Sequence, residues 1–152
     1  MGSAGRATMP ILVLLFRIVL GAILVGAGLL KVGHAPDLAA AIAGFRLLPS
    51  AIVAPLALGL PYLEILLGLY LFLGLFTRIA AIVTSVQFLV YAAAIASAIL
   101  RHIPANCGCF GPHDVATADW PHVLFDIVLA AIAACIALRA PGALALDRRM
   151  TR

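Results

Sequence analysis

Charged residues are scarce in this chain: only 11% of its 152 residues are Asp, Glu, Lys or Arg. A soluble domain usually carries about 25% charged residues and about 45–50% apolar ones. Here 65% of the residues are hydrophobic, and the mean hydropathy is +1.20. This balance excludes an ordinary soluble globular domain. The small positive net charge does not indicate a nucleic-acid partner, because basic residues also flank membrane spans.

Long polar segments are also scarce, and four apolar stretches take up most of the chain. A membrane span needs roughly 20 mostly apolar residues. The four stretches cover residues 10–32, 52–76, 79–100 and 120–139. They predict an all-α membrane protein, with a four-transmembrane-helix bundle forming one domain over 10–139. The lipid bilayer is then its first partner.

The remaining segments are short. Residues 1–9 predict a disordered leader, and residues 140–152 a basic, poorly ordered cytoplasmic tail. Between the first two spans, Leu38, Ile42 and Phe45 recur at helical spacing in a stretch too short to cross a bilayer. We expect a short amphipathic helix on the membrane surface there.

The distribution of basic residues predicts the orientation in the membrane. With four spans, both termini share a side with the turn between spans two and three. That side carries Arg6, Arg78, Arg139, Arg148, Arg149 and Arg152, and the other carries Lys31, Arg46 and Arg101. Positive charge is retained on the cytoplasmic side. The prediction is a multi-pass protein of the cell inner membrane with cytoplasmic termini, which places the 101–119 loop outside the cytoplasm.

Three polar side chains lie inside the expected spans at similar depths. Counted at ~1.5 Å per residue, Arg17, Glu64 and Gln87 fall within a turn or two of one another. We expect them to form one buried cluster, with Arg17 and Glu64 paired at its centre. Such a cluster can fix helix packing, which is the favoured interpretation, or it can couple protons or a quinone to a reaction.

Asp126 is a fourth polar residue within a span, one helical turn below His122. Both side chains can face the loop before the fourth span. His122 would then accept a proton from a thiol, while Asp126 orients the imidazole. The alternative is an interfacial histidine beside a helix-packing aspartate that contacts Lys31.

Cysteine is rare, yet two of the three cysteines are separated by a single glycine in the polar loop. A disulfide between Cys107 and Cys109 closes a very small ring and would gain little as a structural link. Strained or exposed disulfides exchange readily, so the pair is typical of thiol–disulfide exchange. Cys135, deep in the fourth span, is out of reach of the loop and is interpreted as a small buried hydrophobic residue.

A second interpretation of the loop is metal capture. His102, Cys107, Cys109 and His113 offer four ligands of types that suit zinc or copper. Their spacing matches no structural zinc pattern. Metal binding by these four residues is therefore kept as the alternative, and the leading interpretation has no metal in the loop. In a third interpretation the two thiols have no chemical role.

Several segments, in this order, carry a family likeness. "FRIVLGAILVGAGLLKVG", "FRLLP", "PYLEILLGLYLFLGLFTRIAA" and "CGCFG" resemble the MauE branch of the DoxX-like membrane proteins. The resemblance implies a four-helix membrane bundle, with Cys107 and Cys109 as a redox pair and Arg17 and Glu64 as intramembrane polar positions. Asp126 departs from the pattern expected early in span four. MauE is associated with maturation of the disulfide-rich small subunit of methylamine dehydrogenase, beside a thioredoxin-like partner.

The leading hypothesis from the sequence is a membrane thiol–disulfide redox protein, with thiol–disulfide oxidoreductase as its candidate enzyme class. Cys107 and Cys109 would exchange electrons with an extracytoplasmic thioredoxin-like protein, one cysteine attacking and the other resolving the mixed disulfide. A lipid quinone between the helices is the most economical electron carrier. The rival hypotheses are an accessory or assembly subunit of a larger complex and a metal-handling protein.

Overall fold

Four long apolar helices and one short helix make up the fold in the computed structural model, which describes residues 3–104 and 118–147. The helices are α1 (Ser3–Lys31), α2 (Ala35–Gly44), α3 (Ser50–Leu73), α4 (Thr77–Leu100) and α5 (Trp120–Arg139). The expected fold class, a four-helix membrane bundle with a short extra helix between spans one and two, is confirmed.

Each long helix contains a segment long and apolar enough to cross a bilayer. These segments are Met9–Lys31, Ser50–Leu73, Thr77–Leu100 and Trp120–Arg139. Helices suit this environment because they satisfy every backbone hydrogen bond internally. The chain is therefore a multi-pass membrane protein.

Two local expectations from the sequence differ from the structure near the helix starts. The leader expected to be disordered is helical from Ser3, since α1 continues through Pro10 without a break. Alanine and methionine in this stretch favour helix, so the apolar run is extended rather than preceded by coil. α3 begins at Ser50, two residues before the expected second span, and ends at Leu73, three residues before its expected end.

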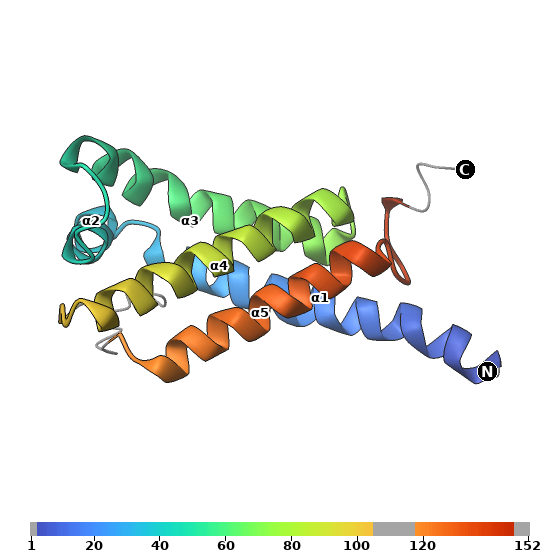
Figure 1. The fold of residues 1–152 in the computed structure, drawn as a ribbon. Coiled ribbons are helices and arrows are strands. Elements are labelled where there is room, and N and C mark those ends of the chain that lie inside the picture. The colour runs from blue at the N-terminus through green and yellow to red at the C-terminus, as the bar shows by residue number, and fades with distance from the viewer. Residues whose placement is uncertain (1–2, 105–117, 148–152) are drawn as a thin grey trace.

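The bundle is built from two helix pairs. α1 packs along α3, and α4 packs along α5, while α3 and α4 are in contact over a shorter length. Figure 1 shows both termini at one end of the bundle, which we call the termini end. α2 and the residues on either side of segment 105–117 lie at the opposite end, which we call the loop end.

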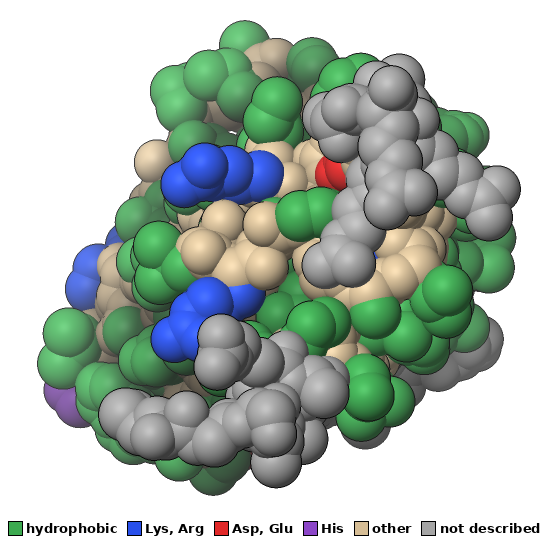
Figure 2. Space-filling model, turned by 90° about the vertical axis from the view of Figure 1, so that its right-hand side faces the viewer, with side chains coloured by type: hydrophobic (Ala, Val, Ile, Leu, Met, Phe, Trp, Pro, Cys, Tyr) green, Lys and Arg blue, Asp and Glu red, His purple; other side chains and the backbone are tan. Residues whose placement is uncertain are grey.

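Figure 2 looks onto the termini end and shows Lys and Arg side chains spread among apolar ones. Arg78 at the start of α4 and Arg139 at the end of α5 are both exposed. This end of the bundle therefore carries exposed positive charge from Arg78 and Arg139.

Glycine lets α1 and α3 approach at backbone distance. A methyl group added at Gly68 would lie 2.8 Å from the carbonyl oxygen of Gly21 and 2.7 Å from Val25. Small residues at such crossings are the usual means of packing helices in lipid, where no hydrophobic force drives them together. The contact explains why glycine occurs at positions 21 and 68.

Gly68→Ala is accordingly expected to destabilise the bundle by about 1–3 kcal/mol, the usual cost of overpacking. The measurement is unfolding in mixed detergent micelles followed by circular dichroism. Gly59→Ala on the same helix is the matched control, because a methyl group there meets nothing within 4 Å. Equal stability of the two variants would contradict the close approach.

Candidate functional site

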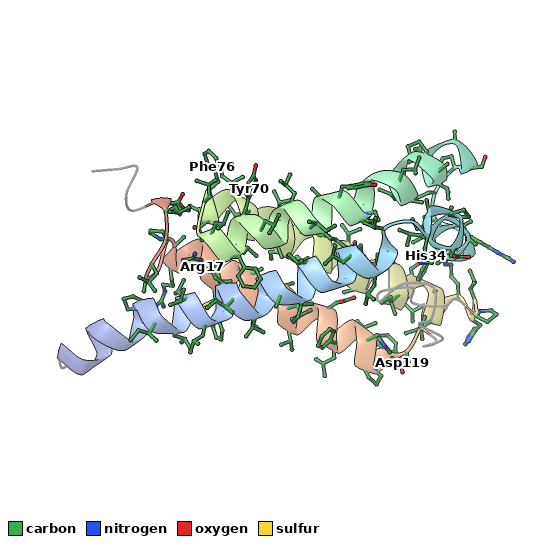
Figure 3. All side chains as sticks on the ribbon, turned by 180° about the vertical axis from the view of Figure 1, so that it is seen from behind. Arg17, His34, Tyr70, Phe76 and Asp119 are labelled. Atoms are coloured by element: carbon green, nitrogen blue, oxygen red, sulfur yellow. The ribbon has the colours of Figure 1, made fainter. Side chains whose placement is uncertain are left out.

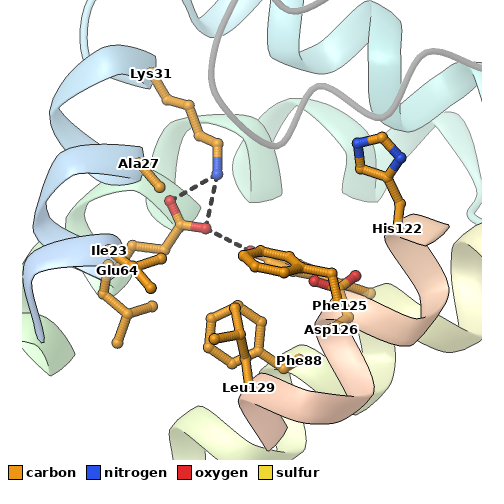
Figure 4. Close-up of a pocket in the computed structure, with 11 residues that line it drawn as sticks. Ile23, Ala27, Lys31, Glu64, Phe88, His122, Phe125, Asp126 and Leu129 are labelled. Atoms are coloured by element: carbon orange, nitrogen blue, oxygen red, sulfur yellow. Dashed lines mark hydrogen bonds and ion pairs between the residues drawn. The ribbon is translucent and has the colours of Figure 1, made fainter. Parts of the chain in front are cut away.

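A buried ion pair joins the end of α1 to the middle of α3. The Lys31 ammonium lies 2.8 Å from each Glu64 carboxylate oxygen. The two side chains are 3% and 1% exposed, so water screens the pair very little. The dashed contacts in Figure 4 show this pair at the centre of the site.

Two side chains of α4 complete the coordination of Glu64. The Tyr91 hydroxyl donates to Glu64 Oε1 at 2.8 Å, and Gln87 Nε2 lies 3.3 Å from the same oxygen. Gln87 Nε2 also donates to the Tyr91 hydroxyl at 2.9 Å. The Lys31 ammonium lies 5.9 Å from the centre of the Tyr91 ring, a cation–π distance. Three helices are thus tied together at one buried acid.

The sequence prediction for this cluster was right for one contact and wrong for another. Glu64 and Gln87 do meet, but Arg17 does not join them. Its guanidinium donates to the carbonyl oxygen of Leu71 at 2.9 Å and lies 3.3 Å from that of Phe72. These carbonyls lie at the end of α3, about two helical turns beyond Glu64. Lys31, placed at the membrane surface by the sequence argument, takes the role expected of Arg17.

Arg17 instead holds the segment that follows α5. Its Nη1 donates to the carbonyl oxygens of Pro141 at 3.0 Å and Ala143 at 3.1 Å. Figure 3 shows Arg17 toward the termini end, with Asp119 and His34 at the opposite end. We call Arg17 and residues 140–147 the arginine clasp.

Asp147 closes the arginine clasp onto the start of α4. Its carboxylate accepts hydrogen bonds from the backbone N–H groups of Phe76 at 2.8 Å and Thr77 at 2.9 Å. Partial burial raises the pKa of the Asp147 carboxyl, but hydrogen bonds from Thr77 and Phe76 and the nearby Arg17 charge lower it by more. Its net pKa lies below the ordinary value.

The segment expected to be a poorly ordered tail is therefore docked as far as Asp147. The backbone N–H of Ala143 donates to Pro10, and those of Leu146 and Asp147 donate to Leu73 and Gly74. The Leu73 and Gly74 carbonyls are ones that the end of α3 leaves open, whereas Pro10 lies inside α1, and together these bonds hold the segment in place.

His122 and Asp126 lie on the same side of α5 but are not partners. His122 Nδ1 hydrogen-bonds to Asp119, whose carboxylate also accepts the His122 backbone N–H at 3.0 Å as the cap of α5. The hydrogen bond from His122 lowers the pKa of the Asp119 carboxyl. The expectation that Asp126 orients His122 is therefore wrong, because the helix cap brings Asp119 closer to the ring. The D-x-x-H spacing before an apolar run is the signal that could have revealed this.

Asp126 faces the buried ion pair across a small cavity. It is 4% exposed, and its Oδ2 has no hydrogen-bond partner among the residues that the structure describes. The cavity measures about 30 Å³ and is lined by Lys31, Glu64, His122 and Asp126 along with apolar side chains. It has the size that one water molecule needs. Figure 4 shows His122 on the loop-end side of Asp126 in this site.

Chemically, this arrangement can hold charge and conduct protons over a short range. The Glu64 carboxylate, the Lys31 ammonium and the Tyr91 hydroxyl are joined by hydrogen bonds along which a proton can pass, and the Asp126 carboxylate lies across the cavity from them. The four bonds to Glu64 also fix the register of α1, α3 and α4. The sequence interpretation gave a packing role to a cluster centred on Arg17 and Glu64, whereas in the structure the cluster is centred on Lys31 and Glu64.

The candidate redox and metal residues are mostly outside the described part of the chain. Cys107, Cys109 and His113 fall within residues 105–117. His102 is described: it is exposed and lies in a turn with φ of 53° directly after α4. Cys135 lies on α5 near the termini end and is a free thiol.

Comparisons with known proteins agree with the resemblance found in the sequence. The family model described as methylamine utilisation protein MauE matches residues 9–139. The methylamine utilization protein MauE of Paracoccus denitrificans is 33% identical over 135 residues, which cover 88% of this chain and 73% of the relative. No solved structure matches. Because the family match spans all four long helices, the chain belongs to the MauE family.

Proposed function

We propose that this chain is a membrane thiol–disulfide exchange protein whose redox pair is Cys107 and Cys109. The observation that carries the proposal is the C-x-C spacing in the polar loop between α4 and α5 of a MauE-family bundle. One thiolate attacks a disulfide of an extracytoplasmic thioredoxin-like partner, and the second cysteine resolves the mixed disulfide.

His122 supports this proposal from the loop side of α5. It stands four residues after the described chain resumes at Ala118, and Asp119 holds its Nδ1. With Nδ1 occupied, Nε2 is the ring nitrogen left to exchange a proton. We propose His122 as proton acceptor for an attacking thiol, with Asp119 rather than Asp126 orienting the ring.

The orientation we propose has both termini in the cytoplasm and the loop outside, in the cell inner membrane. Lys31 is buried in its ion pair and Arg17 in the arginine clasp, so neither is a flanking charge. Arg46 and Arg101 then remain at the loop end, against the exposed Arg78 and Arg139 at the termini end, and the sequence adds four more arginines near the two chain termini. This strengthens the positive-inside argument.

The cellular process in which this chain takes part is proposed from its relative in Paracoccus denitrificans. Its name assigns it to methylamine utilisation. We propose the same process for this chain, with maturation of a disulfide-bonded enzyme subunit as the step. The thiol chemistry can be tested without assuming that process.

The test is a redox titration of purified protein in detergent. Thiol alkylation and mass spectrometry follow Cys107 and Cys109 across dithiothreitol and glutathione series, which together cover the range of potentials. We expect a reversible two-electron transition between roughly −300 and −120 mV, the range of exchange proteins. Cys135→Ser is the matched control and should leave the transition unchanged. A Cys109→Ser variant should accumulate a mixed disulfide with its partner.

Two other results would overturn the proposal. Thiols that remain reduced at every potential, together with full function of the Cys107→Ser/Cys109→Ser variant, indicate an accessory subunit. Thiols protected from alkylation only when zinc or copper is added indicate metal binding, and His102 and His113 should then matter equally.

A further inference from the structure

Asp126 is a buried acid that has no part in the proposed thiol chemistry. It stands six residues after Trp120, ~9 Å along α5, and its side chain is 4% exposed. An ionisable group inside a span is rare and expensive, because no bulk water solvates its charge. Its protonation state is therefore set by the protein groups around it.

The titratable groups that face Asp126 come from all four long helices. They are Lys31 of α1, Glu64 of α3, Tyr91 of α4 and His122 of α5, which line one small cavity with it. Figure 4 shows these groups on the α1, α3 and α5 sides of the cavity. The Lys31 ammonium and the Glu64 carboxylate neutralise each other at 2.8 Å. His122 has a counter-charge of its own in Asp119, which caps α5.

An ionised Asp126 would leave this site with one unbalanced negative charge. Asp126 has no ion-pair partner in the part of the chain that the structure describes, and its Oδ2 accepts no hydrogen bond there. The nearby Lys31 ammonium is engaged by both oxygens of Glu64. An isolated buried carboxylate is so costly that it is neutralised by binding a proton.

A metal ion does not fit in place of that proton. The cavity beside Asp126 measures about 30 Å³, which is room for about one water molecule. Hard cations need about six oxygen ligands, and the described residues contain no group of three or more acidic, histidine or cysteine side chains that could hold a metal. The Lys31 ammonium, which lines the same cavity, would also repel a cation.

We propose that Asp126 is a proton-binding site and that its proton is exchanged with the loop end through His122. His122 lines the same cavity and is 29% exposed, so its ring joins the buried acid to water. Binding of the proton needs no cysteine. Its use in catalysis rests on the proposed function: the proton passes from Asp126 through His122 to the leaving thiolate of the partner, and the proton of the attacking thiol restores it.

Infrared spectroscopy of the purified protein in detergent tests the site, because a protonated carboxyl has a carbonyl band distinct from those of carboxylates and amides. At about pH 7, where exposed carboxyls are ionised, we expect about one protonated carboxyl per chain. The band should disappear in Asp126→Asn and persist in Lys31→Met/Glu64→Leu, which lacks the other acid at the cavity. Asp37→Asn is the matched control: Asp37 is 62% exposed on α2, so its loss should leave the band unchanged.

The rate at which this band shifts in D₂O tests the route through His122. In His122→Leu the shift should be at least about tenfold slower, because no titratable ring then joins the acid to water. His34→Leu is the control, since His34 is 48% exposed at the same end and does not line the cavity.

Two results would overturn the proposal. Absence of the band at neutral pH, or its persistence in Asp126→Asn, would remove the proton site, and an unchanged rate in His122→Leu would remove the route. The cysteines take no part in either measurement, so failure here is distinct from failure of the redox titration.

Discussion

Lys31→Met is expected to destabilise the bundle by about 3–5 kcal/mol, the cost of breaking a buried ion pair from one side. The substitution keeps most of the side-chain volume but removes the only cation within 4 Å of Glu64 in the described chain. The Tyr91 and Gln87 donors remain, and they do not neutralise a carboxylate that is 1% exposed. Glu64→Leu should destabilise the bundle by a similar amount, because it leaves the Lys31 ammonium buried without a carboxylate partner.

The double variant separates this effect from loss of packing. Lys31→Met/Glu64→Leu removes both charges together, and apolar replacements of buried ion pairs are often neutral or stabilising. We expect the double variant to be more stable than either single variant, giving a coupling energy of about 2 kcal/mol or more.

The free energy of unfolding of each variant is measured in mixed detergent micelles by circular dichroism. Arg46→Met is the control, since Arg46 is an exposed cation at the same end and should change stability by about 0.5 kcal/mol or less. Additive effects of Lys31→Met and Glu64→Leu would show that the pair is not coupled.

The pattern of apolar runs was sufficient to predict the helices, because a continuous apolar run of about 17–25 residues can cross lipid as a helix that satisfies its own backbone hydrogen bonds. The short helix α2 was also predictable from its spacing of Leu38, Ile42 and Phe45. Both arguments depend on local sequence alone. The extension of α1 to Ser3 was missed because the leader is only weakly apolar and helix propensity is a weak signal.

The pairing of polar groups between helices was less predictable. It depends on the axial shift and rotation of each helix, and an error of two turns moves a partner by ~11 Å. Arg17 and Glu64 were matched by depth, yet α1 and α3 are offset so that Lys31 reaches Glu64. Lysine at the end of a span is usually expected to extend toward water, so its burial gave no signal in the sequence.

The arginine clasp was missed for a different reason: its bonds are made mainly to backbone carbonyls. A sequence pattern identifies donors such as Arg17, but every residue supplies a carbonyl. Which ones remain open depends on where α3 ends and where the chain turns after α5. Only the three-dimensional arrangement brings Leu71 and Pro141 to the same guanidinium.

Arg17→Met is expected to release residues 140–147 and to destabilise the bundle by about 3 kcal/mol or more. Four carbonyl oxygens, two on α3 and two after α5, lose a charged donor in a buried site, and one unsatisfied buried group already costs roughly 1–3 kcal/mol. Arg17→Lys should recover only part of the loss, because an ammonium is a point donor and cannot reproduce the planar fork of a guanidinium.

Hydrogen–deuterium exchange distinguishes release of the clasp from general loosening of the helices. The amides of Ala143, Leu146 and Asp147 donate across to α1, α3 and the turn after α3, so they should exchange at least about tenfold faster in Arg17→Met, while amides in the middle of α4 remain protected. Arg78→Met is the matched control, since Arg78 is an exposed arginine at the same end. Unchanged protection of the three amides would mean that the Asp147 bonds to α4 hold the segment without Arg17. In the expected case, one buried arginine sets both the stability of the termini end and the order of the chain that follows the last span.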